Sequence, residues 1–360
     1  IKYFLVAILF VLFDVEVIFF YPYAVNFRAL GWEGFKAVVL FVGLFITGFI
    51  YIFNYFVLSN LILLFVCLFI GIFLKKAKAI PENFHTSLNA FVIYISLSAL
   101  SFYYISKVHI SSKVLFPMAV SWIGIVAAIL FFVVLGKIFS WKHSVIGALI
   151  MCAGFGNTSF VGIPVIQALY GEEGIKTVML VDQPNLVALF TIGILVTNYY
   201  SGKKDSVLNN IKKIFKTPPF IAFLAALVVN FFSIEIPKDI DDVFFKLAST
   251  TVPLALISVG SQMQWKKLEP KENFYLLWGL LFKLIIFPLI ILIIYKFLFH
   301  QSGEMIEISI LEAAMAPMIT AAIIAASHNL EPKLCNLIVA IGIPVSFITL
   351  AAWYFILQIL

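Results

Sequence analysis

Charged residues are scarce in this chain of 360 residues: Asp, Glu, Lys and Arg make up 12% of it, whereas 63% is hydrophobic. A typical soluble domain carries about 25% charged residues, so a soluble protein of this size could not cover its surface. The apolar residues form long unbroken runs, which excludes the alternating pattern of a membrane β-barrel. Because only helices and closed barrels can span lipid, the sequence predicts an all-α protein embedded in the lipid bilayer.

Residues that commonly catalyse reactions or bind metals are also few. The three cysteines, Cys67, Cys152 and Cys335, lie in or beside apolar runs without metal-ligand spacing, so we interpret them as buried small side chains. The five histidines lie near the ends of apolar runs. The sequence has no Ser/His/Asp set, P-loop or HExxH motif. We therefore expect no catalytic residues, no metal site and no cofactor in the main part of the chain.

Twelve apolar runs are long enough to be membrane-spanning helices, at roughly 20 residues per span. The chain begins with Ile1 rather than Met, and its first run lacks the features of a signal peptide. We expect a truncated start rather than a cleaved leader. The runs cover about residues 3–21, 35–54, 57–74, 88–106, 115–136, 145–169, 177–200, 219–233, 244–263, 274–299, 305–327 and 334–359.

Lysines are distributed unequally among the loops that connect the ten runs after residue 57. One alternate set of loops carries 14 lysines and the other carries 6, and the positive-inside rule places the richer set in the cytoplasm. This distribution accounts for the net charge of +6 without an acidic partner such as nucleic acid. The Lys-rich segment 201–218 divides the ten runs into two blocks, 55–200 and 219–360. Five helices per block predict an inverted-repeat transporter, preceded by two extra transmembrane helices.

The fourth run of this ten-run block is interrupted by helix-breaking and polar residues. Pro removes a backbone donor and Gly permits non-helical dihedral angles, and backbone groups freed inside a membrane are tolerated where they line a cavity. A half-helix that starts there would direct its N–H groups and positive dipole end at an anion. We therefore predict a substrate-binding site for a carboxylate, with a kinked packing helix as the alternative. The residues concerned are Gly154, Gly156, Asn157, Thr158, Ser159, Gly162 and Pro164.

Two further breaks are predicted in the second block. Pro317 lies in the middle of the run 305–327, the ninth of the ten, and three residues before Thr320. Pro253 lies in the run 244–263, the seventh of the ten. Breaks at corresponding depths of two halves are typical of transporters whose substrate binds near the membrane midplane. We therefore predict that broken helices four and nine cross at the substrate site, with Pro317 and Thr320 as substrate-binding residues and Pro253 as a helix break.

Three ionisable residues lie inside apolar runs, where such residues are costly and usually functional. Asp182 lies about one turn into the run 177–200, Lys283 lies in the middle of the run 274–299, and Glu312 lies about two turns into the run 305–327. An interfacial Asp182 and a snorkelling Lys283 are the simpler alternatives, but the depth of Lys283 favours a pair with Glu312 or Asp182. A carboxylate here could couple transport to H⁺ or Na⁺, and the sequence does not choose between them.

With these residues in place, the stretch from about 55 to 360 resembles the auxin efflux carrier family. Asn157, Phe160, Gly162 and Pro164 match the family's Asn-x-x-Phe-x-Gly-x-Pro crossover motif. The resemblance implies ten helices in two inverted five-helix repeats that cross at helices four and nine. It also implies transport of small organic anions, of the malate or malonate type, across the inner (cell) membrane, and a possible homodimer.

The resemblance carries individual residues over only in part. Asn157 and Pro164 carry over directly as crossover residues, and Pro317 fits the second crossover with looser surroundings. The chain departs from the family at Ser98, where the second helix usually has Pro. This departure puts the flexibility of that helix in doubt.

Residues 1–54 instead resemble the A subunit of NADH-quinone oxidoreductase, through Phe13-Asp14-Val15-Glu16 followed by Tyr21-Pro22. The resemblance implies that Asp14 and Glu16 lie in a membrane arm beside a quinone and proton path. It also implies that other NADH dehydrogenase subunits are partners and hold the NAD and quinone. An interfacial acidic pair is the alternative reading of Asp14 and Glu16. The first helix of that family and the loop after it have no counterpart here.

The two resemblances disagree about orientation. The third helix of the oxidoreductase subunit ends in the cytoplasm, whereas the lysine distribution places the start of the transporter block outside. The linker at about 54–57 is too short to cross a membrane. We therefore hypothesise a fusion, or a gene-model join of two neighbouring reading frames. The predicted function is secondary transport of small carboxylates coupled to an ion gradient. The alternative is a membrane subunit of a proton-translocating NADH-quinone oxidoreductase.

Overall fold

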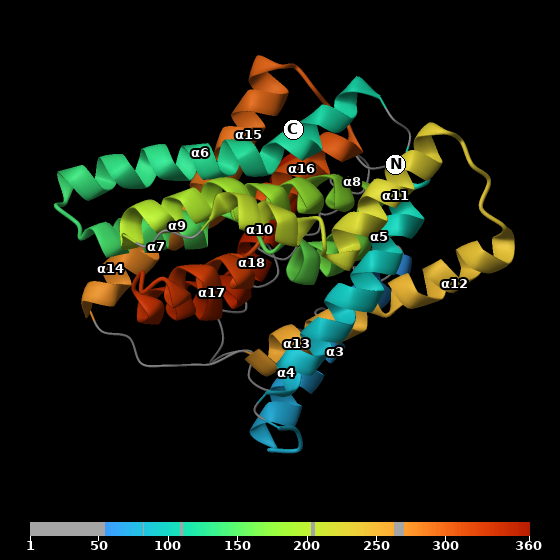
Figure 1. Cartoon of the computed structure of the whole chain (residues 1–360), viewed down its shortest axis with the longest axis horizontal. Coiled ribbons are helices and arrows are strands. Elements are labelled where there is room, and N and C mark those ends of the chain that lie inside the picture. Colours follow the sequence, from blue (N-terminus) through green and yellow to red (C-terminus); the bar gives the residue numbers. More distant parts are fainter. Residues whose placement is uncertain (1–54, 82, 109–110, 203–205, 263–269) are drawn as a thin grey trace, which may run out of the picture. The chain divides into compact units, whose positions relative to one another are not determined.

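The computed structural model describes residues 55–360 except 82, 109–110, 203–205 and 263–269 (Figure 1). The predicted helices over 3–21 and 35–54, with Asp14 and Glu16, lie outside the described residues. The chain divides into two compact units, residues 1–62 and 63–360. The second unit holds all the residues predicted to bind substrate.

The described residues are almost entirely helical, which confirms the predicted all-α membrane architecture. Six helical stretches among them are long and apolar enough to span a membrane: Phe84–Ile105, Ser112–Ile138, Thr158–Ser201, Lys238–Gln262, Asn273–Leu298 and Pro332–Ile359. In order, the elements are α3 (Tyr55–Lys76), α4 (Phe84–Phe91), η1 (Val92–Ser96), α5 (Leu97–Ile105), η2 (Ser112–Val114), α6 (Leu115–Ile138), α7 (His143–Gly154), η3 (Thr158–Gly162), α8 (Ile163–Ala188), η4 (Leu189–Gly193), α9 (Ile194–Ser201), α10 (Val207–Ile214), α11 (Pro218–Phe231), α12 (Lys238–Ser249), α13 (Thr251–Gln262), α14 (Pro270–Leu281), η5 (Phe282–Ile286), α15 (Phe287–Leu292), η6 (Ile293–Leu298), α16 (Glu304–Ala313), α17 (Ile319–Ser327) and α18 (Pro332–Ile359).

The longest stretch, Thr158–Ser201, joins the second half of the predicted run 145–169 to the predicted run 177–200 across a kink. Gly171 has φ 72° and ψ −165°, a conformation that is strained for residues with a side chain. The sequence predicted the later run to begin near 177, because Glu172, Glu173 and Lys176 lower the hydropathy of the residues after the kink. Asp182 therefore lies roughly three turns into its helix, deeper than predicted.

The helices of the second unit pack in two groups. In the first group, α5 packs against α11 and α12, and α4 packs against α13. In the second group, α6 packs against α7 and α8, α16 packs against α8, and α17 and α18 pack against each other and against α7 (Figure 1). The groups meet where α5 contacts α8 and where α13 contacts η3. Both interrupted runs predicted to cross belong to the second group.

Helices α3 and α13 approach each other backbone to backbone through two glycines. A Cβ atom at Gly71 would lie 2.2 Å from the Ile257 carbonyl oxygen, and one at Gly260 would lie 2.2 Å from the Leu68 carbonyl oxygen. Only glycine fits at both positions, because neither carbonyl can move without moving its helix.

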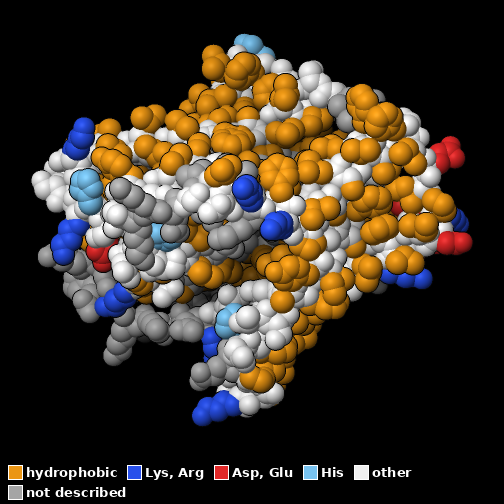
Figure 2. All heavy atoms as spheres, in the orientation of Figure 1, with side chains coloured by type: hydrophobic (Ala, Val, Ile, Leu, Met, Phe, Trp, Pro, Cys, Tyr) orange, Lys and Arg blue, Asp and Glu red, His pale blue; other side chains and the backbone are white. Residues whose placement is uncertain are grey.

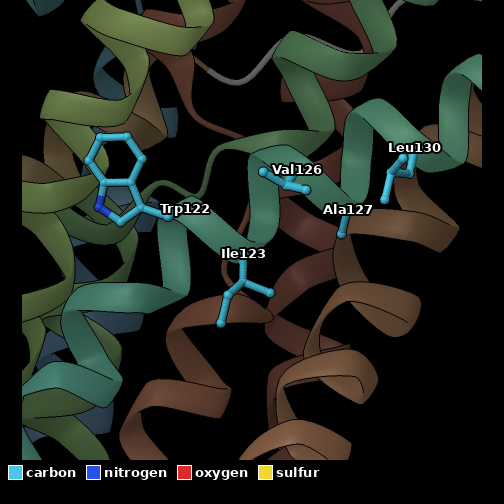
Figure 3. Close-up of a pocket in the computed structure, with 5 residues that line it drawn as sticks. All are labelled: Trp122, Ile123, Val126, Ala127 and Leu130. Carbon is cyan, nitrogen blue, oxygen red and sulfur yellow. The ribbon is translucent and has the colours of Figure 1, made fainter.

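The outer surface is largely apolar, as expected of a protein surrounded by lipid. Figure 2 shows hydrophobic side chains over much of the visible face, with most charged side chains toward its edges and some Lys or Arg side chains nearer its middle. Helix α6 exposes Leu115, Leu130 and Ile138 by 64–67% each. A shallow hollow of about 390 Å³ on α6 is lined by apolar side chains, among them Trp122 and Leu130 (Figure 3). It contains no predicted site residue, and its chemistry suits lipid acyl chains.

Candidate functional site

The first break separates α7 from η3. Phe155 is extended, with φ −117° and ψ 137°, and Asn157 leaves the helical region, with φ −82° and ψ 67°. The side chain of Asn157 caps the new helix, because its Oδ1 accepts a hydrogen bond of 3.2 Å from the Phe160 N–H. Asn is among the best N-cap residues, which explains why the chain restarts as a helix at this position.

The second break separates α16 from α17 and lies against the first. Gly156 and Pro317 form an antiparallel bridge. The Asn157 N–H donates to the Ala316 carbonyl at 2.8 Å, and the Met318 N–H donates to the Phe155 carbonyl at 3.1 Å. Each break therefore satisfies backbone groups that the other has freed, which is the condition for irregular backbone inside a membrane.

Pro253 also coincides with a helix boundary, but the interruption is slighter. Helix α12 ends at Ser249 and α13 begins at Thr251. Ser249 is four residues before Pro253. Proline has no N–H to donate to the Ser249 carbonyl, and its ring would clash with that carbonyl in a regular helix. Thr250 keeps right-handed helical dihedral angles, and its hydroxyl lies 2.7 Å from the Ser96 hydroxyl. The interruption before Pro253 is therefore limited to Thr250.

A buried carboxylate lies beside the first break. Asp182 is 7% exposed, and its Oδ1 accepts hydrogen bonds from the Thr158 hydroxyl at 2.5 Å and from the Ser159 hydroxyl. Its Oδ2 accepts a bond of 3.2 Å from the Gln183 amide. The structure therefore brings three of the predicted site residues together. The donors around Asp182 suit an ionised carboxylate.

Asn185 was not predicted from the sequence, although it follows Asp182 closely. Its amide donates to the Gly156 carbonyl at 2.9 Å, and it is 1% exposed. It therefore holds the backbone of the first break from the adjoining helix. The signal that could have found it is Pro184 between Gln183 and Asn185, which concentrates polar and helix-distorting residues in an apolar run.

Lys283 and Glu312 lie on the side of the second break. The Lys283 ammonium donates to the Ala313 carbonyl at 2.9 Å, and its side chain is 0% exposed. Lys283 takes part in neither of the ion pairs Lys107–Asp241 and Lys176–Glu173, and its hydrogen bond is to the backbone. Lys283 is thus bound to the backbone beside Glu312. The sequence had instead favoured an ion pair with Glu312 or Asp182.

Several buried polar atoms at the paired breaks have no hydrogen-bond partner among the described residues. A Cβ at Gly162 would lie 2.6 and 2.7 Å from the two carboxylate oxygens of Glu312, so this carboxylate rests directly on the glycine of the crossover motif. Unpaired polar atoms at such depth are expensive and are typical of sites that bind a ligand. The atoms are Asn157 Nδ2, Gln183 Oε1, Glu312 Oε1 and Glu312 Oε2.

The remaining predicted residues are placed less centrally. Pro164 is buried in the first turn of α8. Thr320 is exposed on α17, outside the buried polar cluster. Ser98, which stands where the resembled family has Pro, donates its hydroxyl to the Tyr94 carbonyl at 3.1 Å. The preceding segment η1 is a π-helix, so this helix is irregular without the proline.

Comparison with known proteins identifies the larger part of the chain. Residues 56–354 match the family described as membrane transport protein. The chain belongs to this family. It is 27% identical, over 82% of its length and 97% of the relative's, to an uncharacterized transporter of Methanocaldococcus jannaschii. It is 22% identical, over 84% of its length and 98% of the relative's, to the uncharacterized transporter YfdV of Escherichia coli.

The beginning of the chain matches a different family, as the sequence predicted. Residues 1–60 match NADH-ubiquinone/plastoquinone oxidoreductase chain 3. They are similar to the A subunit of NADH-quinone oxidoreductase from Flavobacterium psychrophilum, with 64% identity over 52 residues. This similarity covers 14% of the chain and 43% of the relative. Both predicted resemblances are thereby confirmed, and they meet at residues 56–60.

Proposed function

We propose that residues 55–360 form a secondary transporter of small organic anions, of the malate or malonate type, in the cell (inner) membrane. The proposed architecture is two inverted five-helix repeats, 55–200 and 219–360, joined by the Lys-rich segment 201–218. Membership of the membrane transport protein family supports the general function. The observation that carries the substrate class is the buried amide Nδ2 of Asn157, which has no partner among the described residues and lies beside the bridge between Gly156 and Pro317.

The chemistry of the first break favours an anion. Helix η3 begins at Thr158, and the first N–H groups of a helix and its dipole attract negative charge. The amide Nδ2 of Asn157 is buried without a partner among the described residues, and it is a hydrogen-bond donor. A substrate carboxylate at this position would satisfy that donor. Thr158, Ser159 and the exposed Thr320 are further groups that we assign to the substrate path.

Uptake by the purified full chain in proteoliposomes tests this proposal. We expect accumulation of labelled malate or malonate by the wild type and a loss of at least about tenfold in Asn157→Ala, because a buried donor to a charged group contributes about 1.5–3 kcal/mol. Asn209→Ala is the matched control, since Asn209 is exposed on α10. Equal uptake by Asn157→Ala and the wild type would place the substrate elsewhere.

A second function is proposed for the beginning of the chain, on the strength of the 64% identity to the oxidoreductase subunit. Under this alternative the chain assembles with other NADH dehydrogenase subunits, which hold the NAD and the quinone. We infer instead that two reading frames are joined near residues 54–57. Genomic reads across codons 50–60 and the intact mass of the native protein test the join. A continuous frame with a full-length product that copurifies with NADH-quinone reductase activity would favour the alternative.

A further inference from the structure

Three buried charged side chains converge where the two breaks pair. Asp182, Lys283 and Glu312 are 7%, 0% and 1% exposed. Asp182 of α8 and Lys283 of η5 both act electrostatically on Glu312. The other charged residues of α16 and of the helices packed against it are Glu304 and Glu307 in the first turn of α16, Glu172, Glu173 and Lys176 beside the Gly171 kink of α8, Lys137 in the last turn of α6 and Lys333 in the first turn of α18. The charge balance at the breaks is therefore set by Asp182, Lys283 and Glu312.

Lys283 places its ammonium where the surrounding backbone favours a positive charge. It lies in η5, a π-helix, which is an irregularity common at functional sites. Its ammonium binds the carbonyl of Ala313, the last residue of α16, where the helix dipole favours positive charge. The same ammonium lies 3.1 Å from where a Cβ of Gly156 would be. The ammonium therefore lies close to both breaks.

Glu312 has the opposite character, because its carboxylate oxygens lack any hydrogen-bond partner among the described residues. They rest on Gly162, which offers no side-chain oxygen to a metal ion. Transporters bind Na⁺ through several backbone and side-chain oxygens, and here Asp182 is occupied by hydroxyl donors and the Ala313 carbonyl by Lys283. A proton needs only the carboxylate itself.

We propose that Glu312 carries the coupling proton and that Lys283 replaces a bound sodium ion, so that a substrate anion and a proton occupy the site together. This inference rests on the proposed transport of organic anions. In this proposal the empty site has Asp182 and Glu312 ionised and Lys283 protonated, which gives it one net negative charge. Protonation of Glu312, from COO⁻ and H⁺ to COOH, removes that charge, and a monovalent anion restores it; for malate or malonate this is the singly protonated form. The buried charge is then the same before and after loading, which avoids the cost of burying an additional anion.

Counterflow and net uptake in proteoliposomes separate the coupling proton from substrate binding. We expect wild-type uptake driven by a pH gradient to be unchanged when choline replaces Na⁺. Glu312→Gln should keep substrate counterflow within about threefold and lose at least about tenfold in pH-driven accumulation, because the amide mimics the protonated acid. Glu304→Gln, at the exposed start of the same helix, is the control. Sodium-dependent uptake, or loss of counterflow in a folded Glu312→Gln protein, would overturn the proposal.

An infrared titration decides the same question without transport. The full chain in lipid nanodiscs should show a protonated carboxylic-acid band that disappears with added base, is absent from Glu312→Gln and is unaffected by Na⁺. A band that Na⁺ displaces, or that persists in Glu312→Gln, contradicts the inference. If the wild type moves no carboxylate by counterflow, the proposed function fails, whereas the assignment of the proton to Glu312 still stands or falls by this titration.

Discussion

The two breaks pair through backbone hydrogen bonds, but their side chains differ in chemistry. The first, around Gly156 and Asn157, is rich in hydrogen-bonding side chains and is held by Asn185 of the next helix. The second, around Pro317, is lined by Ala and Met, and its polar contribution comes from Glu312 and from a carbonyl bound by Lys283. One break therefore presents donors suited to an anion, while the other presents the charges that balance it.

The largest effect is expected where the second break depends on one side chain. Lys283→Met leaves the Ala313 carbonyl without its side-chain donor and the buried carboxylate of Glu312 without its positive neighbour. Removing one member of a buried charge arrangement costs about 3–5 kcal/mol. We expect a fall of that size in unfolding free energy, measured in detergent. Lys296→Met, in η6 near the end of the same apolar run, should change stability little.

A double variant sharpens this prediction. Lys283→Met combined with Glu312→Gln removes a charge of each sign, so stability should recover in part. Purely additive losses would show that Lys283 acts only as a donor to the backbone, and that the second break is not a charge-balancing site.

Gly162 of the first break contacts Glu312 beside the second. We expect a substitution at this contact to reduce stability by an intermediate amount. A methyl group at Gly162 would lie 2.6 Å from a Glu312 oxygen, so Gly162→Ala must displace the carboxylate. Overpacking of this kind costs about 1–3 kcal/mol. Thermal unfolding should show the loss, and Glu312→Ala in the same chain should relieve part of it by making room. Gly193→Ala is the control, because its new Cβ would lie 3.2 Å or more from side-chain carbons, which have to move by only a few tenths of an ångström. If the two substitutions are independent, the breaks are not coupled through this contact.

The breaks could be predicted from the sequence better than their partners could. Gly and Pro within an apolar run have local consequences, so the interruptions at 155–157 and 314–318 could be placed from the sequence. Asp182 could be predicted as a site residue because a charge inside a membrane is rare. Its hydrogen bonds with Thr158 and Ser159 could not be predicted from the spacing of these residues in the sequence. The all-α membrane architecture followed from composition.

What escaped prediction depends on contacts between distant parts of the chain. Lys283 was expected to pair with a carboxylate, yet it binds a backbone carbonyl, and every residue offers one. Gly162 looked like a residue for helix breaking, whereas its contact with Glu312 requires the fold to be known. The π-helices, such as η1 before Ser98 and η5 at Lys283, follow from no residue pattern comparable to the Gly and Pro of the breaks. The ten-helix inverted repeat stays a prediction.

The smallest effect is expected from the hydrogen bond that holds the first break. Asn185→Ala removes the donor to the Gly156 carbonyl and leaves that carbonyl buried, which costs about 1–3 kcal/mol, the lower end applying if water reaches it. The bridge to Pro317 still holds the segment, because the Asn157 and Met318 N–H groups keep their carbonyl partners. We therefore expect a modest loss of thermal stability in detergent, with exposed Asn209→Ala unchanged. A loss as large as that of Lys283→Met would contradict the expected difference between the breaks, since the first break would then depend on a single side chain as much as the second does.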